Sequence, residues 1–353
     1  MKEAVPENHS QRPDQSQKPV VGGLGKLVDG FGRRIDYLRL SVIEDCNFRC
    51  FYCMPKKRVN QRSGCESLQF EELFRLVRAF ADLGVRNVRL TGGEPLLRRD
   101  LTELAARVGE LDGIIDLSLS TNAYLLARVA DPLHRAGVQR VNISLDSLNA
   151  DNFRRITRGG ELSRVLNGID RALEVGMAPV KLNMVVMRDV NDHEIDDMID
   201  FSMARGLNLR FIETMPVGQE GTDVMARHVP ATDILARVRE RFGGDLIPVK
   251  GRMGAGPGRY YQIGGEAMTV GVISAVSRHF CESCNRVRLS ARGELLLCLG
   301  RRNRVDLAPL VRDGASDQEI RDAISQGIAN KPWGHDFADR DAARATRMSA
   351  IGG

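Results

Sequence analysis

Residues 38–53 read LRLSVIEDCNFRCFYC and join a strand pattern to a cluster of cysteines. Residues 38–43 form a short apolar run, which predicts a buried strand. Three cysteines follow directly, Cys46, Cys50 and Cys53, with the spacing C-x3-C-x2-C. Thiolates this close together can hold either a [4Fe–4S] cluster or a zinc ion. The pattern therefore predicts metal chemistry just after the first strand.

The number of ligands bears on the choice between the two metals. A structural zinc site normally has four protein ligands, but this loop offers three, and the next cysteine is Cys65. Three thiolates on a cluster of four irons leave one iron open to bind a small ligand. A surface zinc knuckle stays an alternative when the spacing is considered alone.

Beyond this loop, apolar strand patterns alternate with amphipathic helical patterns. Three of the helical patterns end at a glycine, Gly84, Gly137 or Gly176. This alternation predicts a parallel sheet covered by helices. Six such units are too few for a closed eight-stranded barrel, so we expect an open, partial (β/α) barrel of the α/β class. The predicted strands are 38–43, 88–90, 114–119, 141–145, 180–186 and 209–212, and the predicted helices include 70–83, 100–111, 161–175 and 192–205.

The composition argues against several classes of protein. Hydrophobic residues make up 42% of the chain, but no run approaches the ~18 apolar residues of a membrane span. The first 20 residues lack the apolar segment of a signal peptide, so we expect a cytoplasmic protein. The net charge of +5 is not gathered in a Lys/Arg tract, which argues against a nucleic-acid-binding arm. Seven cysteines, an odd number, argue against a disulfide framework.

The composition and periodicity of the sequence suggest three regions. Residues 1–32 are polar and without periodicity, and we expect a disordered tail. Residues 33–245 hold the alternating units of the partial barrel. Residues 246–353 begin with a Gly-rich segment, contain a predicted strand at 268–276, and carry the other cysteine group.

This second group consists of Cys281, Cys284 and Cys298, with the spacing C-x2-C-x13-C. Again there are three thiols without an obvious fourth. His279 could complete a zinc site of the Cys3His type, which is common in zinc ribbons. A second iron–sulfur cluster is the other interpretation. A zinc-ribbon module that binds RNA would also need aromatic residues for stacking, and only Phe280 stands beside these cysteines.

Two motifs together resemble the radical S-adenosylmethionine (SAM) superfamily. The first is the C-x3-C-x2-C loop with aromatic Tyr52 before its last cysteine, and the second is Gly-Gly-Glu-Pro at 92–95, after the second strand. The resemblance implies that Cys46, Cys50 and Cys53 hold a [4Fe–4S] cluster, and that the backbone of the Gly-Gly loop binds SAM. In the superfamily, the reduced cluster splits SAM into methionine and a 5′-deoxyadenosyl radical.

Nearly the whole chain, from about residue 33 to 353, resembles the GTP 3′,8-cyclase family, which begins molybdenum cofactor synthesis. The resembling segments are LRLS at 38–41, TGGEPLLRRD at 91–100, NISLD at 142–146, RFIE at 210–213, the cysteine segment 281–298 and the final two glycines. The resemblance implies a second [4Fe–4S] cluster on Cys281, Cys284 and Cys298, whose open iron binds the guanine of GTP. The implied product is (8S)-3′,8-cyclo-7,8-dihydroguanosine 5′-triphosphate.

The resemblance also assigns individual residues. The GTP contacts are Arg39, Arg89, Lys181, Arg210, Arg286 and Arg288. Three of these, Arg89, Lys181 and Arg210, stand inside predicted buried strands, where charge is unusual. The SAM contacts are Tyr52, Gly93, Ser120, Ser144 and Met215, with Ser120 where the family often has Thr. The tail residues Gly352 and Gly353 are assigned to catalysis, because the family's tail reaches into the active site.

The chain departs from the family pattern at a few positions. Asn87 stands where many relatives have a basic residue, so one phosphate contact is expected to be absent. Ala350 stands where Tyr is frequent, and Cys65 matches nothing in the pattern. The nearest alternative is a radical SAM enzyme that modifies a peptide or protein. The implied partners are GTP, a flavodoxin or ferredoxin-like electron donor, a downstream cyclic pyranopterin monophosphate synthase and, as dimers are frequent in the family, a second copy of the chain.

Overall fold

The structure is a computed structural model that describes residues 27–56, 66–249, 254, 256–264, 269–337 and 348–352. Cys65, Gly353 and residues 1–26 of the predicted tail lie outside these residues. Residues 27–32, which the composition assigned to the tail, instead pack onto the fold. Leu27 is buried, and Val28 pairs with Arg34 in a β-bridge.

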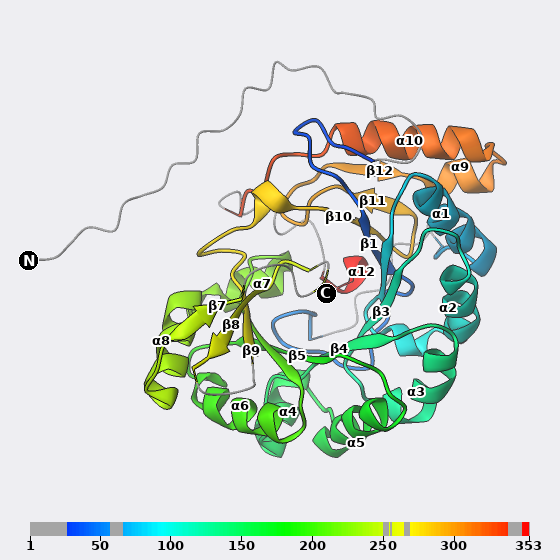
Figure 1. The fold of residues 1–353 in the computed structure, drawn as a ribbon. Helices are drawn as coiled ribbons and strands as arrows, with labels where there is room; N and C mark the ends of the chain where they lie inside the picture. Colours follow the sequence, from blue (N-terminus) through cyan, green and yellow to red (C-terminus); the bar gives the residue numbers. More distant parts are fainter. Residues whose placement is uncertain are drawn as a thin grey trace, which may run out of the picture.

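All the strands join one sheet, in the order β12-β11-β10-β1-β2-β3-β4-β5-β6-β9-β8-β7 (Figure 1). Six parallel strands form its centre, as the alternation predicts. They are β1 (Tyr37–Ser41), β2 (Asn87–Thr91), β3 (Asp116–Thr121), β4 (Arg140–Ser144), β5 (Val180–Val186) and β6 (Asn208–Glu213). Their apolar side chains are buried against the surrounding helices. The partial (β/α) barrel predicted from the sequence is confirmed.

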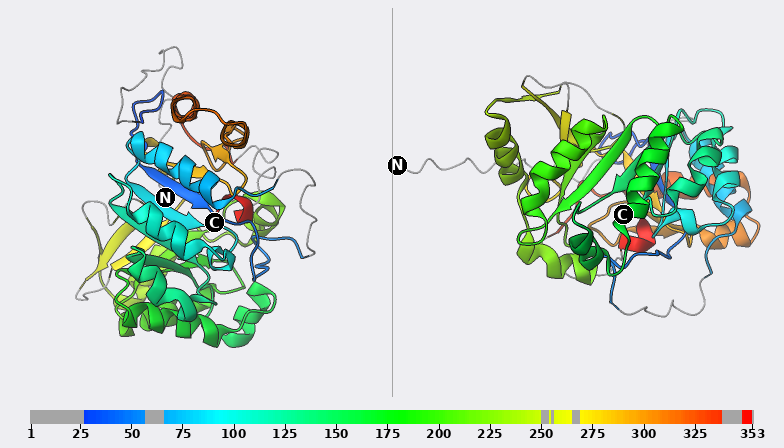
Figure 2. Two further views of the ribbon diagram at one scale, coloured as in Figure 1. Left: turned by 90° about the vertical axis from the view of Figure 1, so that its right-hand side faces the viewer. Right: turned by 90° about the horizontal axis from the view of Figure 1, so that it is seen from below.

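The outer layer consists of amphipathic helices between successive strands (Figures 1 and 2). They end where the glycines predict: Gly84, Gly137 and Gly176 all have positive φ just after a helix. The structure adds α4, which the sequence reading did not predict. The helices of this layer are α1 (Phe70–Asp82), α2 (Leu101–Gly109), α3 (Leu126–Arg135), α4 (Ala150–Thr157), α5 (Leu162–Glu174), α6 (Ile195–Ala204) and α8 (Ala231–Phe242).

The C-terminal region extends the barrel sheet at both edges. One part pairs β10 in parallel with β1, and another pairs β9 in parallel with β6. Antiparallel strands then continue the sheet outward on each side. The added strands are β7 (Leu246–Pro248), β8 (Arg259–Ile263), β9 (Thr269–Ile273), β10 (Arg286–Leu289), β11 (Glu294–Leu296) and β12 (Arg304–Asp306).

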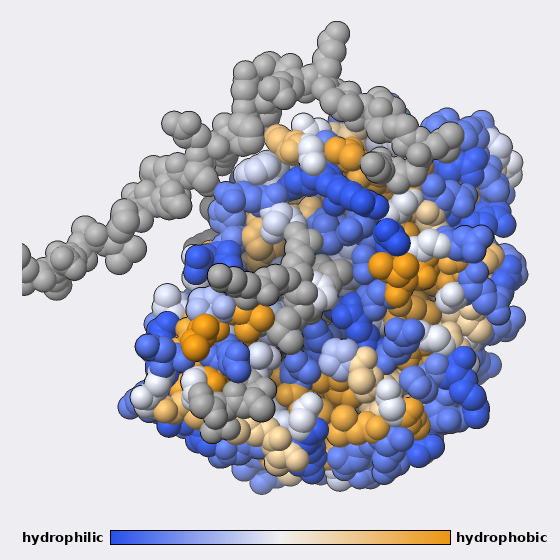
Figure 3. Space-filling view, viewed as in Figure 1, coloured by the Kyte–Doolittle hydropathy of each residue, from blue (hydrophilic) through white to orange (hydrophobic). Residues whose placement is uncertain are grey.

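The remaining helices of the described chain are α7 (Gly218–Val224), after β6, and three near the C-terminus. Helices α9 (Ala308–Arg312) and α10 (Asp317–Ala329) lie over α1, where Arg75 and Asp317 form an ion pair. Helix α12 (Met348–Ile351) lies in the middle of the ring of strands (Figure 1). Hydrophilic residues cover most of the rim of the face in Figure 3. Within the described residues, none of the helices combines the length and apolar character needed to cross a bilayer.

Candidate active site

The first cysteine trio lies at the carboxyl end of β1 and lines a cavity of about 260 Å³. Backbone bonds from Arg49 to Thr157 (3.0 Å) and from Phe51 to Ile156 (3.1 Å) fix its loop against the end of α4. Burial raises the pKa of Cys46 to about 11 and that of Cys53 to about 12. Without a metal these thiols are therefore neutral, and a metal that binds them must displace their protons.

The donor set of this trio fits a [4Fe–4S] cluster. Three thiols share one cavity, and the backbone N–H of Phe48 donates to the Cys46 sulfur at 3.4 Å. Among the described residues, no three His, Cys, Asp or Glu side chains are placed to share a single metal ion. A cluster binds its thiolates at separate corners of a cube, so this finding does not bear on it. It does mean that the described residues provide no Cys3His zinc set around His279.

The Gly-Gly-Glu-Pro loop lies directly against the cysteine loop. A Cβ at Gly93 would stand 2.3 Å from the Asp45 carbonyl oxygen, and one at Gly92 would stand 2.6 Å from that of Ile43. The backbone N–H of Gly93 donates to the Ile43 carbonyl at 2.8 Å, which holds the two loops together. Only glycine permits this approach.

Glu94 fixes the other side of the same loop. Its carboxyl is fully buried and accepts bonds from the Thr121 hydroxyl (2.6 Å) at the end of β3 and from the Asn122 N–H (2.8 Å) directly after it. These donors favour the ionised form, but burial outweighs them and raises the pKa of Glu94 to about 7. The sequence reading quoted Glu94 within the loop but gave it no role.

The five residues assigned to SAM all line the same cavity: Tyr52, Gly93, Ser120, Ser144 and Met215. Tyr52 is oriented by Asp146, whose carboxylate accepts the phenolic O–H at 2.6 Å and the Val185 N–H at 2.8 Å. Burial raises the pKa of Asp146 to about 6. Sequence reasoning missed this carboxylate, although it stands inside the quoted segment 142–146.

The six cations assigned to GTP come from five strands that lie close together. Register places Arg39 beside Arg89 on one neighbouring strand and beside Arg288 on the other. All of the six except Lys181 line the cavity. Lys181 is buried, and both burial and the charge of Arg210 lower its pKa, to about 7. Burial likewise lowers the pKa of Arg89 to about 9.

These cations lie close together, although like charges repel one another. Arg89 donates to the neutral Ser118 hydroxyl and Arg210 to the neutral Asn142 amide, at 3.1 and 2.6 Å. The Nε atoms of Arg210 and Arg286 are buried, and none of the described residues accepts a hydrogen bond from them. Buried, mutually repelling guanidinium groups are costly unless an anion compensates them, so this arrangement suits a polyanion. Asn87 donates to the Asp36 carbonyl and adds no charge.

The C-terminal tail enters this cavity. Arg288 donates to the carbonyls of Ile351, at 3.1 Å, and of Gly352, and Arg39 reaches the Gly352 carbonyl at 3.3 Å. Gly352 has φ of +73°, and a Cβ there would stand 1.9 Å from the Thr91 hydroxyl oxygen. Two arginines assigned to GTP thus bind the tail in this structure.

The second cysteine trio lies around β10 and β11. Burial acts to raise the pKa of Cys284, but the charges of Lys331 and Arg286 outweigh it, so the pKa is lowered. Burial raises the pKa of Cys281 and of Cys298. The backbone of His335 acts against this rise at Cys281. Three thiols in these surroundings fit a second cluster with an open iron.

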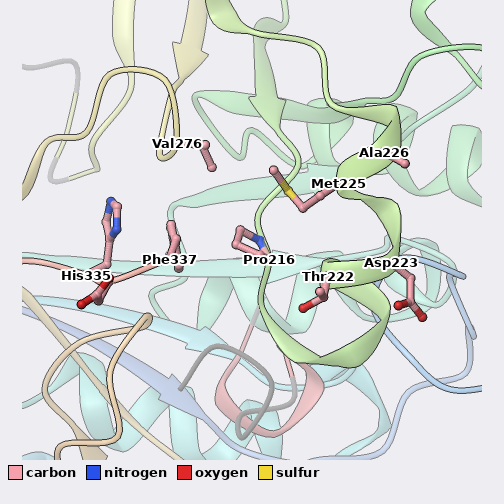
Figure 4. Close-up of a pocket in the computed structure, with 9 residues that line it drawn as sticks. Pro216, Thr222, Asp223, Met225, Ala226, Val276, His335 and Phe337 are labelled. Carbon is pink, nitrogen blue, oxygen red and sulfur yellow. The ribbon is translucent and has the colours of Figure 1, made fainter. Parts of the chain in front are cut away.

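A further cavity of about 640 Å³ opens beside His335 (Figure 4). The His335 ring stacks on Phe337, with ring centroids 4.0 Å apart, and both its ring nitrogens are buried. Pro216, Met225 and Val276 lie across from it. None of the residues predicted to form the active site lines this cavity.

Two known protein families match this chain, and each match covers one of the cysteine trios. Residues 40–202 match the Radical SAM superfamily, and residues 207–337 match Molybdenum Cofactor Synthesis C. The GTP 3′,8-cyclase of Hydrogenovibrio crunogenus is 48% identical over 312 residues, 88% of this chain and 94% of that protein. The GTP 3′,8-cyclase of Geobacter sulfurreducens is 45% identical over 330 residues, 93% of this chain and all of that protein.

Among solved structures, Streptococcus suis SuiB bound to S-adenosylmethionine has a similar fold. The TM-score is 0.60 at 15% identity, over 84% of this chain and 68% of that one. At this identity the likeness extends to the fold alone. The curated relatives, in contrast, match at 40–48% identity over most of their length. The chain therefore belongs to the GTP 3′,8-cyclase family of the radical SAM superfamily.

Proposed function

We propose that this chain is a radical SAM GTP 3′,8-cyclase, a lyase that converts GTP to (8S)-3′,8-cyclo-7,8-dihydroguanosine 5′-triphosphate in the first step of molybdenum cofactor synthesis. One observation carries the proposal. A cavity that begins at the first cysteine trio is lined by buried and partly buried arginines, and two of them, Arg286 and Arg288, stand between Cys284 and Cys298 of the second trio. The site therefore pairs a metal-binding loop with a receptor for a polyanion.

The residues at the first trio would hold and orient SAM. Cys46, Cys50 and Cys53 would bind a [4Fe–4S] cluster that, with SAM, supplies a 5′-deoxyadenosyl radical. The bare backbone at Gly93 lets a ligand approach the loop closely. Tyr52 presents an aromatic face to the same cavity, and its bond to Asp146 limits the rotation of that ring.

The cations would bind the triphosphate of GTP. Several guanidinium groups that converge on one polyanion form charge-assisted, often bidentate hydrogen bonds. Their burial strengthens each bond because little water competes. Cys281, Cys284 and Cys298 would hold the second cluster beside the guanine. Arg39 and Arg288, which reach both the tail and the cavity, would hold the tail next to the bound nucleotide.

The physiological setting follows from this activity. A flavodoxin or ferredoxin-like protein would supply electrons in the cytoplasm. The cyclised triphosphate would pass to a separate cyclic pyranopterin monophosphate synthase. A homodimer is the expected assembly.

The test is anaerobic reconstitution followed by turnover. The protein should bind about eight irons and no zinc, at four irons per cluster. With GTP, SAM and a reductant, mass spectrometry should detect the cyclised nucleotide and 5′-deoxyadenosine. Cys50→Ser should abolish both products, because oxygen is a poor ligand for this soft site, while Cys65→Ser is the matched control. Formation of 5′-deoxyadenosine by Cys50→Ser, or absence of cyclised GTP with the unaltered protein, would overturn the proposal.

A further inference from the structure

The two cysteine trios lie in surroundings of opposite charge. Carboxylates lie close to the first trio. Asn122 donates its backbone N–H to Glu94 at 2.8 Å and its side-chain amide to the Cys46 sulfur at 3.9 Å, and Asp146 accepts the hydroxyl of Tyr52, the residue before Cys53. Cations lie close to the second trio: Lys331 donates to the Leu297 carbonyl next to Cys298, and Arg33 donates to the Cys281 carbonyl at 2.8 Å. Cys281 is buried and the other five cysteines of the two trios are partly buried, so solvent screens these charges less than on an open surface.

Lys331 is the buried cation of this second group. It follows the C-terminus of α10 and is 3% exposed. Its ammonium group does not turn back onto the helix carbonyls but donates to the carbonyl of Leu297, the residue before Cys298. This contact holds the charge next to the backbone that carries one of the three thiols.

The counter-ion of Lys331 is not a described carboxylate. Arg33, the other buried cation near this trio, is paired with Asp29 at 2.6 Å. Lys331 has no such ion pair within residues 27–56, 66–249, 254, 256–264, 269–337 and 348–352. A buried ammonium is strongly unfavourable unless a negative charge compensates it. Three thiolates on an iron–sulfur cluster would provide the missing negative charge.

We infer that Lys331 is the fixed charge that sets the second cluster at a higher reduction potential than the first. The inference rests on the proposed function in taking both trios as clusters. Reduction adds one negative charge to a cluster, so a nearby cation stabilises the reduced form and a nearby carboxylate destabilises it. Lys331 raises the potential at one end of the active site, whereas Glu94 and Asp146 lower it at the other.

The experiment measures the second cluster alone in the full-length chain. The first trio is replaced by Ala, and the remaining cluster is titrated anaerobically with EPR detection at set potentials. Lys331→Met removes the charge, Lys331→Gln removes it but keeps a donor for the Leu297 carbonyl, and Lys331→Arg keeps both. Arg302→Met removes an exposed cation near Cys298 and is the matched control.

The two neutral variants should have a lower midpoint. At the wild-type midpoint, their ratio of reduced to oxidised cluster should fall at least tenfold, which is about 59 mV for one electron. Lys331→Arg and Arg302→Met should stay within about twofold. The first cluster, titrated with the second trio replaced by Ala, should not respond to Lys331→Met.

An unchanged midpoint in Lys331→Gln would overturn the inference, as would an equal shift in the first cluster. A failure of the proposed function would be distinguished by the iron content and by the EPR signals. The unaltered chain would then bind about four irons instead of eight, and no second EPR signal would exist to titrate.

Discussion

At the scale of single residues, the site is built from charges that burial would normally exclude. Glu94 is fully buried beside the first trio, and Arg89, Lys181 and Arg210 are 4–6% exposed. The cations were predictable, because a charge inside an apolar strand pattern is visible in the sequence. The carboxylates were not, because the environments of Glu94 and Asp146 arise from contacts with β3 and β5 that no local pattern encodes.

The burial of Glu94 predicts a pH-dependent stability. Its pKa in the folded chain is about 7, above the usual 4.5. Between these values the folded state keeps a proton that the unfolded state has lost, so the free energy of unfolding falls as pH rises. Glu94→Gln should remove this part of the slope, on the order of 3 kcal/mol between pH 4 and 8. Urea denaturation of the apoprotein measures it, with exposed Glu103→Gln as the control. Parallel pH curves for wild type and Glu94→Gln would contradict the assignment.

Arg286 and Arg288, which follow Cys284 in the chain, allow a prediction of the binding free energy that is lost with one phosphate contact. Arg286→Ala and Arg288→Ala should each weaken GTP binding by about 1.5–3 kcal/mol, because a charge-assisted hydrogen bond is lost. This corresponds to a roughly ten- to hundredfold rise in Kd. Anaerobic calorimetry measures the affinity, and the exposed Arg302→Ala is the matched control. Unchanged affinity in both variants would argue against a triphosphate substrate, provided that both bind about eight irons.

At the scale of elements, the sheet brings together segments that are far apart in the chain. The alternation of strands and helices predicts β1 to β6, because each unit is local. The pairing of β1 with β10 joins residues about 250 positions apart, and the sequence of neither strand indicates which strand it pairs with. This pairing sets Arg288 beside Arg39 and brings Arg286, which follows Cys284, to the cavity. Helix α4 was missed because it has eight residues and no strand separates it from the longer helical pattern at 161–175.

The contact between the Gly-Gly loop and the cysteine loop predicts a selective loss of function. In Gly93→Ala, the added carbon would meet the Asp45 carbonyl at 2.3 Å, so the two loops must separate. We expect weaker SAM binding and at least a tenfold fall in 5′-deoxyadenosine formation, since misplacement of reacting groups is costly. The second cluster should keep its iron. Gly256→Ala, whose Cβ would meet nothing within 4 Å, is the control.

An iron count and a product assay after reconstitution test this expectation. About four irons should remain if the first loop loses its cluster, and about eight if only the binding of SAM is impaired. Wild-type rates of 5′-deoxyadenosine formation in Gly93→Ala would show that the close approach is not needed.

At the scale of the whole molecule, the C-terminal tail contacts strands β1 and β10 of the sheet. Ile351 is buried against Val217 and Leu296, so the segment before Gly352 is packed rather than frayed. The Gly352 carbonyl then accepts bonds from Arg39, on the first strand, and Arg288, on the tenth. The sequence reading predicted a tail in the cavity only from family resemblance. A terminal Gly-Gly pattern alone is also typical of a loose chain end.

Removal of the tail glycines should separate SAM cleavage from cyclisation. Deleting Gly352 and Gly353 leaves both trios and the SAM residues in place, so cluster content and 5′-deoxyadenosine formation should change little. It frees Arg39 from the tail and leaves Arg288 with its bond to Ile351, so GTP affinity should be kept. The cyclised product should nevertheless fall steeply, because the tail no longer orients the nucleotide in the cavity. The measured quantity is the ratio of cyclised nucleotide to 5′-deoxyadenosine under anaerobic conditions.

A point variant makes the same test without shortening the chain. Gly352→Ala should also lower the ratio, because its Cβ would overlap the Thr91 hydroxyl and φ there is +73°. Gly314→Ala is the control for a positive φ, at +80° on an exposed turn where the Cβ would meet nothing. It should cost some stability but leave the product ratio unchanged. If the deletion and Gly352→Ala both keep the wild-type ratio, the arginine contacts only anchor the terminus, and orientation of the nucleotide must come from the barrel itself.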